Sequence, residues 1–297
     1  MEDQSLHGVI AAAPTPLDSA GEPDCDRLIG FIRYLLKEGC HGVNLLGTTG
    51  EATSFDRATR LKIMKAVAEH QDLLPHVMVG TGAASVDDTI ALTTAADELG
   101  YKGALLLPPF YYKDLAQDAL QRYIGEVAEK VAPSNIRFYL YNFPQLTGLT
   151  YTRETVAALA DDLGSLLAGL KDSSGNLPYA EDLAGSFPQL SIFPSNEAVL
   201  SRWRDAGFAG CISASVNVAP KLARKVFDGQ ESASDVVQAM NAVRAAVSSV
   251  PLVPAVKFGV SLQQRDAAWT RTKTPLSALN VADRDSLTTR LASLGVI

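Results

Sequence analysis

Short apolar runs alternate with longer amphipathic segments along most of the chain. The apolar runs predict buried strands near residues 8–13, 42–46, 77–80, 103–107, 137–141, 167–171, 190–193 and 210–214. Between them, helical spacing is preceded by helix-start residues such as Asp24, Ser85 and Thr152. Thr53 and Asp56 have the spacing of a capping box, which predicts that a helix begins directly after Thr53. This alternation predicts a parallel sheet with helical crossovers.

The number of strand–helix units separates two α/β folds. Eight units favour a closed (β/α)8 TIM barrel over an open, doubly wound sheet. No Gly-x-Gly-x-x-Gly motif follows the first predicted strand, which disfavours a dinucleotide-binding open sheet. Towards the C-terminus the strand pattern ends, and helices are predicted near residues 236–247, 254–264 and 283–294. We expect residues 1–228 to form the barrel with its active site, and residues 229–297 to form a C-terminal helical region packed on it.

Composition limits the classes of function. The 297 residues carry a net charge of −7 and no basic run, which disfavours nucleic-acid binding. The longest apolar stretch, residues 250–260, is interrupted by Pro251, Pro254 and Lys257, so we expect no membrane span. The three cysteines form no Cys-x-x-Cys motif, which argues against a disulfide framework or a zinc knuckle. With no signal-peptide pattern at the start, these features predict a cytoplasmic protein.

Lys171 and Tyr141 lie where the sixth and fifth predicted strands end. They are 30 residues apart, about one strand–helix–strand unit, so their strands should be parallel neighbours. Active sites of (β/α)8 barrels are built at the C-terminal ends of the strands. A lysine amine is nucleophilic only without its extra proton, and apolar surroundings favour that neutral form. An amine beside a phenol in such a place predicts Schiff-base chemistry on a ketone, with Tyr141 relaying protons.

Other strand ends supply candidate substrate contacts. Gly47, Thr48 and Thr49 follow the second strand, and free backbone N–H groups with two hydroxyls suit a carboxylate. Ser173 after the sixth strand and Ile212 on the eighth are further expected substrate contacts. The four histidines show no metal-ligand spacing, so we expect neither a metal nor another cofactor.

Each of these residues also has a purely structural interpretation. Lys171 could pair with Asp172, Tyr141 could be a packed barrel residue, and the glycine-rich loop could be a simple turn. Lys257 is a second candidate amine, but it lies on an apolar helical stretch rather than at a strand end. A snorkelling or internally satisfied lysine is the favoured interpretation there. The coincidence of the candidates at successive strand ends favours a functional site.

Three motifs together resemble the dihydrodipicolinate synthase / N-acetylneuraminate lyase family of class I aldolases. They are Gly-Thr-Thr-Gly-Glu at 47–51, Tyr-Asn-Phe-Pro at 141–144 with Thr147 and Gly148, and Gly-Leu-Lys-Asp at 169–172. The resemblance covers essentially the whole chain. It implies a (β/α)8 barrel and a homotetramer, a dimer of dimers, that acts on pyruvate or another 2-oxo acid.

The same resemblance implies roles for the candidate residues. Lys171 would be the Schiff-base lysine and Tyr141 the proton relay. Thr48 and Thr49 would hold the substrate carboxylate. Tyr112 would reach into the neighbouring subunit's site and connect through Thr49 to Tyr141, with Tyr111 as the alternative for that role.

Departures from the family motifs bear on the substrate. Synthases of the family carry an arginine for a second carboxylate where this chain has Leu146, and sialic acid lyases carry an aspartate where it has Asn196. The motifs here are more similar to those of aldolases for 2-keto-3-deoxy sugar acids. We therefore predict a lyase that cleaves such an acid to pyruvate and an aldehyde. Alternatives are a dihydrodipicolinate synthase, a dehydratase of the family, and a non-catalytic protein that binds a 2-oxo acid.

Overall fold

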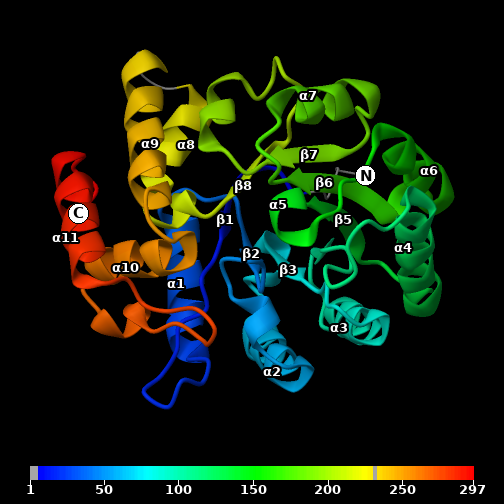
Figure 1. Ribbon diagram of the computed structural model, residues 1–297, viewed down its shortest axis with the longest axis horizontal. Coiled ribbons are helices and arrows are strands. Elements are labelled where there is room, and N and C mark those ends of the chain that lie inside the picture. The colour runs from blue at the N-terminus through cyan, green and yellow to red at the C-terminus, as the bar shows by residue number, and fades with distance from the viewer. Residues whose placement is uncertain (1–5, 230–232) are drawn as a thin grey trace.

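The computed structural model describes residues 6–229 and 233–297 (Figure 1). Its eight strands are β1 (Gly8–Ala12), β2 (Gly42–Leu45), β3 (Val77–Gly80), β4 (Gly103–Leu106), β5 (Arg137–Asn142), β6 (Leu167–Asp172), β7 (Ser191–Pro194) and β8 (Gly210–Ser213). The helices of the barrel are α1 (Cys25–Lys37), α2 (Arg57–Ala68), α3 (Val86–Glu98), α4 (Gln117–Val131), α5 (Pro144–Thr147), α6 (Arg153–Leu163), α7 (Leu177–Ser186) and α8 (Pro220–Asp228). The C-terminal helices are α9 (Ala233–Ser248), α10 (Leu252–Gln264) and α11 (Val281–Ser293).

The strands form one parallel sheet that curves into a barrel. Their order is β7-β6-β5-β4-β3-β2-β1-β8, and neighbouring strands in this order are parallel. The two edges meet where Ala209 N, just before β8, donates a hydrogen bond to Ile192 O of β7 at 3.0 Å. The predicted (β/α)8 barrel is confirmed, and the strands' C-terminal ends lie at one mouth.

Alternation along the strands divides their side chains between two cores. One core lies inside the barrel and includes Ile10, Met78, Leu105, Tyr139, Phe193 and Ile212. The other lies between the sheet and the surrounding helices and includes Val9, Val43, Val79, Leu140 and Ile192. Tyr141 belongs to the inner core, so the fold directs its ring into the barrel.

Three predicted helix starts are confirmed by side-chain caps. Asp24, Ser85 and Thr152 each accept a hydrogen bond from the backbone N–H three residues later. The predicted start after Thr53 is wrong, because Asp56 is the residue that caps α2, through Thr59 N at 2.7 Å. Asp56 has the extended backbone of a cap, whereas Thr53 lies in a separate 3-10 turn, Ala52–Ser54.

Two local elements differ from the sequence expectation. After β7, where the alternation of strands and helices predicts an α-helix, Asn196 caps a 3-10 helix, Glu197–Arg202. The short helix α5 was not expected; Pro144 begins it, where a missing N–H costs nothing, and Gly148 ends it with φ of 72°. This short helix carries Leu146 at the mouth of the barrel.

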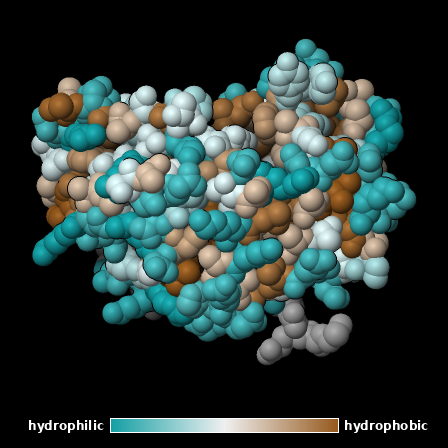
Figure 2. All heavy atoms as spheres, turned by 90° about the horizontal axis from the view of Figure 1, so that it is seen from below, coloured by the Kyte–Doolittle hydropathy of each residue, from teal (hydrophilic) through white to brown (hydrophobic). Residues whose placement is uncertain are grey.

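Helices α9, α10 and α11 gather on one side of the barrel, next to α1 and α8 (Figure 1). Trp269, which follows α10, packs on Phe31 of α1 with ring centroids 4.7 Å apart. Among the described residues no single helix is both long and apolar enough to cross a membrane. Only α9 and α10 taken together have sufficient length and apolar composition, and the angle between them is 117°. On the face in Figure 2, hydrophilic and apolar residues are interspersed.

His41 at the start of β2 is expected to make stability depend on pH. Its Nδ1 accepts a hydrogen bond from Val9 N at 3.0 Å. Burial, and then repulsion from Arg224 and His7, lowers the pKa of His41 from 6.5 to about 4. Since the unfolded chain binds this proton more readily, stability present above pH 6.5 is lost as the pH falls towards 4.

The measurement is the urea midpoint at pH 7 and pH 4.5 for the wild type and for His41→Asn, whose amide oxygen can accept from Val9 without titrating. We expect the acid-induced loss to be smaller in the variant by roughly 1 kcal/mol, because partial exposure screens the effect. An equal loss in both proteins would contradict this assignment.

Candidate active site

Lys171 and Tyr141 are cross-strand partners at the mouth of the barrel. The register of β5 and β6 places the two residues opposite one another. Both side chains are buried, with 4% and 3% exposed surface. Lys171 Nζ lies 4.5 Å from the centroid of the Tyr141 ring. The predicted adjacency is therefore confirmed, with the amine held over the face of the phenol.

Asp172 stabilises the ends of these strands instead of pairing with the lysine. Its carboxylate accepts hydrogen bonds from Asn142 Nδ2 at 2.7 Å and from Ser174 Oγ at 2.9 Å. Burial raises the pKa of Asp172, and the bonds from Asn142 and Ser174 oppose that shift. In the described part of the chain no carboxylate forms an ion pair with Lys171. The structural alternative of a Lys171–Asp172 pair is therefore wrong.

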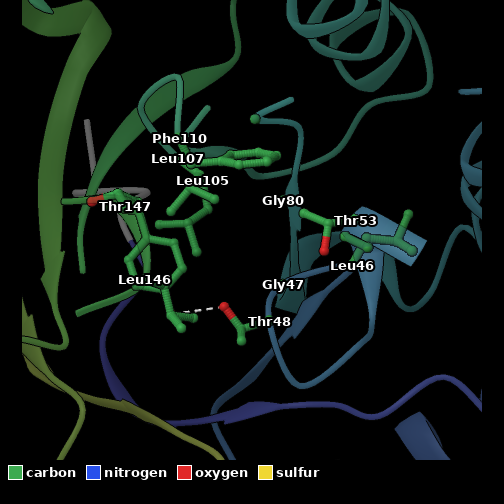
Figure 3. Close-up of a pocket in the computed structure, with 13 residues that line it drawn as sticks. Leu46, Gly47, Thr48, Thr53, Gly80, Leu105, Leu107, Phe110, Leu146 and Thr147 are labelled. Atoms are coloured by element: carbon green, nitrogen blue, oxygen red, sulfur yellow. Dashed lines mark hydrogen bonds between the residues drawn. The ribbon is translucent and has the colours of Figure 1, made fainter. Parts of the chain in front are cut away.

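The loop of residues 47–51, called here the 47–51 loop, brings a hydroxyl to the phenol. Thr48 Oγ1 lies 3.2 Å from Tyr141 OH (Figure 3). The resemblance implied a link from Tyr141 to Thr49, but the hydroxyl that contacts the phenol is that of Thr48, because neighbouring residues of a tight turn point in different directions. Thr49 is buried and lines the cavity above Lys171. A Cβ at Gly47 would lie 2.5 Å from Asn44 Nδ2, so a side chain there requires the Asn44 amide to shift.

A cavity of about 710 Å³ opens above Lys171. Its lining includes Thr48, Thr49, Tyr141 and Ile212. Further along, the hydroxyl-bearing residues are Ser173, Ser195, Ser213, Ser215 and Ser248. The outer wall comes from the C-terminal region, through residues 251–254 at the start of α10 and through Pro275 and Leu276 in the loop before α11. The C-terminal region therefore completes the cavity as well as covering the barrel.

A second cavity of about 230 Å³ adjoins the first and is mostly apolar. Figure 3 shows the apolar side chains that line it: Leu46, Leu105, Leu107, Phe110 and Leu146. Thr48 and Tyr141 line both cavities, so their hydrogen bond lies at the boundary. Leu146 is 53% exposed and also lines both spaces, which places an apolar group at the boundary between them.

A buried carboxylate and an arginine lie at the far side of the larger cavity. Glu197 is fully buried and accepts hydrogen bonds from Ser215 Oγ at 2.7 Å and from Ser213 Oγ. Arg244 Nη1, from α9, lies 3.0 Å from Glu197 Oε2 and donates to Ser195 O at 2.7 Å. Glu197 adjoins Asn196, the residue compared with the sialic acid lyases, whereas Arg244 was not among the candidates from the sequence. No local signal marks an arginine that a distant helix brings to a strand end.

The remaining candidates are placed outside this cavity. Tyr111 and Tyr112 stack edge to face, 5.3 Å between centroids, and are 74% and 66% exposed. Lys257 is fully buried, pairs with Glu51 and donates to Arg271 O at 2.6 Å. Burial lowers the pKa of Lys257, and Glu51 opposes that shift. The prediction of an internally satisfied lysine is confirmed for Lys257.

Within residues 6–229 and 233–297, no group of three or more His, Cys, Asp or Glu side chains is placed to hold a metal ion.

Two comparisons of sequence decide the family. The model of the Dihydrodipicolinate synthetase family matches residues 5–293. A DapA-like lyase of Chloroflexus aurantiacus, named as uncharacterized, is 37% identical over 277 residues, covering 92% of each chain. The chain belongs to the dihydrodipicolinate synthetase family. This membership confirms the predicted resemblance and the prediction of an enzyme of the lyase class.

Solved structures of the family agree in fold. Dihydrodipicolinate synthase from Agrobacterium tumefaciens has a TM-score of 0.91 at 28% identity, covering 97% of this chain and 99% of that one. YagE, an Escherichia coli K12 prophage protein of the dihydrodipicolinic acid synthase family in complex with pyruvate, has a TM-score of 0.89 at 27% identity, covering 98% and 99%. These likenesses extend over the barrel and the C-terminal helices together.

Proposed function

We propose that this family member is a class I aldolase that cleaves a 2-keto-3-deoxy sugar acid to pyruvate and an aldehyde. The observation that carries the proposal is the buried Lys171 amine, free of an ion-pair partner among the described residues, over Tyr141 in a hydroxyl-lined cavity. YagE in complex with pyruvate supports a 2-oxo acid as the substrate class.

The proposed reaction begins when the neutral Lys171 amine attacks the C2 ketone. Loss of water from the carbinolamine gives a protonated imine that withdraws electrons. Tyr141 gives its proton to the departing water, and the phenolate that remains takes the proton of the C4 hydroxyl as the C3–C4 bond breaks, so C4 leaves as the aldehyde and the bond's electron pair forms an enamine. Tyr141 then returns a proton to C3, and water hydrolyses the protonated imine to release pyruvate and the amine, with the surplus proton going back to the phenolate.

The 47–51 loop is proposed to hold the substrate carboxylate. Gly47, Thr48 and Thr49 supply backbone N–H groups and hydroxyls, and a carboxylate accepts such bonds well. Their position supports this, since Thr48 and Thr49 line the cavity that contains Lys171. Ser173 and Ile212 line the same cavity and are proposed to contact the rest of the substrate.

The charges at the far side of the cavity support a polyol over a second carboxylate. Glu197 balances the charge of Arg244, so that region offers donors and acceptors with little net charge. Hydroxyl groups of a substrate can both donate and accept, which suits this surface. A dihydrodipicolinate synthase would need a cation to bind the second carboxylate, and Leu146 offers none.

A homotetramer built as a dimer of dimers is proposed as the assembly. Tyr112 is proposed to enter the site of a neighbouring copy, because two exposed aromatic rings next to each other are typical of interfaces. A cytoplasmic location is proposed as well, and the three free thiols suit a reducing compartment.

Incubation with separate substrates tests the function. We expect pyruvate release from 2-keto-3-deoxygluconate or a related acid, and little consumption of aspartate semialdehyde with pyruvate. Consumption of aspartate semialdehyde with pyruvate, without cleavage of the sugar acid, would favour a synthase. Loss of water from the sugar acid without C–C cleavage would favour a dehydratase. Ligand-induced stabilisation by pyruvate without any turnover would favour a non-catalytic binding protein.

Leu146→Arg is expected to increase condensation with aspartate semialdehyde by about tenfold. The new guanidinium would lie at the mouth of both cavities, where it can pair with a second carboxylate. Initial rates at fixed pyruvate give the measurement, and Leu146→Met serves as the control of similar size. No gain over the control would contradict the account of specificity at this position.

Arg244→Met is expected to raise KM for the sugar acid about 10- to 100-fold, as for the loss of a charged hydrogen bond. The half-saturating concentration of pyruvate alone should stay within about twofold, because the proposed contacts of pyruvate are with Lys171 and the 47–51 loop and not with Arg244. The double variant Arg244→Met/Glu197→Gln removes the unpaired buried charge and controls for misfolding. Equal losses for both ligands would contradict a role limited to the distal part of the substrate.

A further inference from the structure

A buried ion pair connects the 47–51 loop to the C-terminal region. Glu51, the last residue of the loop, pairs with Lys257 of α10, and neither side chain has exposed surface. The carboxylate of Glu51 also accepts from Lys273 N at 2.6 Å. Lys257 Nζ donates in addition to Arg271 O at 2.6 Å. The C-terminal region thus holds the loop through one charged group, Lys257 Nζ, and one backbone group, Lys273 N.

The backbone of the loop is unusual at the same residue. Glu51 has φ of 57° and ψ of 30°, a left-handed conformation that costs a residue with a Cβ some strain. Such strain persists only where the surroundings fix the backbone in place, and it concentrates at functional sites. Here the surroundings are the contacts with Lys257 and Lys273. The ion pair therefore fixes a turn that the loop would not adopt on its own.

That turn determines where the substrate-facing groups lie. Glu51 N donates to Thr48 O at 3.1 Å, and Ala52 N donates to Gly47 O at 3.3 Å. These bonds close the chain around Thr48 and Thr49. Thr48 Oγ1 contacts Tyr141 OH, and both threonines line the cavity above Lys171. A shift of Glu51 would therefore move the hydroxyls and N–H groups that face the substrate.

Stability alone gives a weak reason for this pair. Removing two charges from water is unfavourable, and an apolar pair of similar volume would often serve equally well. We propose that Glu51 and Lys257 are positioning residues that set the geometry of the 47–51 loop for the carboxylate of the 2-oxo acid. This inference rests on the proposed function for the nature of the ligand. It gives the C-terminal region control over substrate affinity, without any contact between Lys257 and the substrate.

The test measures the half-saturating pyruvate concentration for borohydride trapping on Lys171. The proteins are the wild type, Lys257→Met, Glu51→Gln and the double variant. We expect Lys257→Met to raise this concentration at least about tenfold, because small displacements of binding groups have large effects, while the limiting trapping rate changes less than about threefold. The double variant leaves no buried charge unpaired but still lacks the contact between the loop and α10, so its half-saturating concentration should stay raised. Recovery of wild-type affinity in the double variant would assign the effect to an unpaired charge and would contradict a positioning role.

Ile124→Ala in α4 is the matched control, because it creates a buried cavity remote from the loop. It should lower Tm without changing half-saturation. Half-saturation within about twofold of the wild type in Lys257→Met, with a lower Tm, would overturn the inference and leave the proposed function intact. If Lys257→Met fails to fold, Glu51→Gln carries the same test. No adduct in the folded wild type would overturn the proposed function and this inference together.

Discussion

Lys171→Met is expected to reduce the release of pyruvate from a 2-keto-3-deoxy sugar acid by about 10⁴-fold or more. The amine is the proposed nucleophile, and the loss of a nucleophile removes the covalent route entirely. Methionine has a similar length and no charge, so it should occupy the same space over the ring of Tyr141. Steady-state rates under saturating substrate give the measurement.

The same substitution is expected to leave the protein as stable as the wild type or more stable. The Lys171 amine is buried without a carboxylate partner in the described part of the chain, and such a group is unfavourable to bury. Active sites often contain groups that lower the stability of the folded protein but are needed for activity. Lys130→Met on the exposed end of α4 is the control and should change neither rate nor urea midpoint. A rate within about tenfold of wild type in Lys171→Met would contradict the nucleophile assignment.

Tyr141→Phe is expected to lower kcat by about 10²- to 10³-fold with little change in KM, as for the loss of a general acid–base group. The ring stays in the barrel and beneath the lysine, while the hydroxyl that contacts Thr48 Oγ1 disappears. Proton transfer to and from the carbinolamine and the C4 oxygen then depends on water. Rates of pyruvate release over a range of substrate concentrations separate the two parameters.

Tyr139→Phe is the matched control for this prediction. Tyr139 lies two residues earlier on β5 and also faces the inner core, but its hydroxyl accepts from Leu6 N at 3.3 Å, away from Lys171. Its substitution should leave kcat within about twofold. An equal fall in both variants would show that the effect is not specific to the hydroxyl of Tyr141 and would contradict its assignment as the proton relay. A change in KM alone for Tyr141→Phe would contradict its role in proton transfer.

The sequence predicted the barrel and its main pair of residues for a physical reason. Eight apolar strands that alternate with helices commonly form a closed barrel. The 30 residues between Lys171 and Tyr141 correspond to one strand–helix–strand crossover, which makes their strands neighbours. Parallel neighbours then bring their ends together at one mouth. Periodicity and spacing were sufficient for this level of detail.

The finer arrangement of the site required coordinates. Whether Thr48 or Thr49 faces Tyr141 depends on the backbone angles of a turn, which sequence spacing does not determine. Glu197 and Arg244 come together from separate elements, and Glu51 meets Lys257 across 206 residues. Such contacts leave no periodic pattern in the sequence. They became visible only when the packing of the C-terminal helices on the barrel was known.

Borohydride reduction in the presence of pyruvate, followed by peptide mass spectrometry, tests the central claim most directly. A Schiff base reduced in place leaves a stable adduct on the lysine that formed it. The account predicts an adduct on the peptide that contains Lys171 and none on the peptide that contains Lys257. An adduct confined to another lysine, or no adduct on folded protein, would contradict the assignment of Lys171 as the nucleophile.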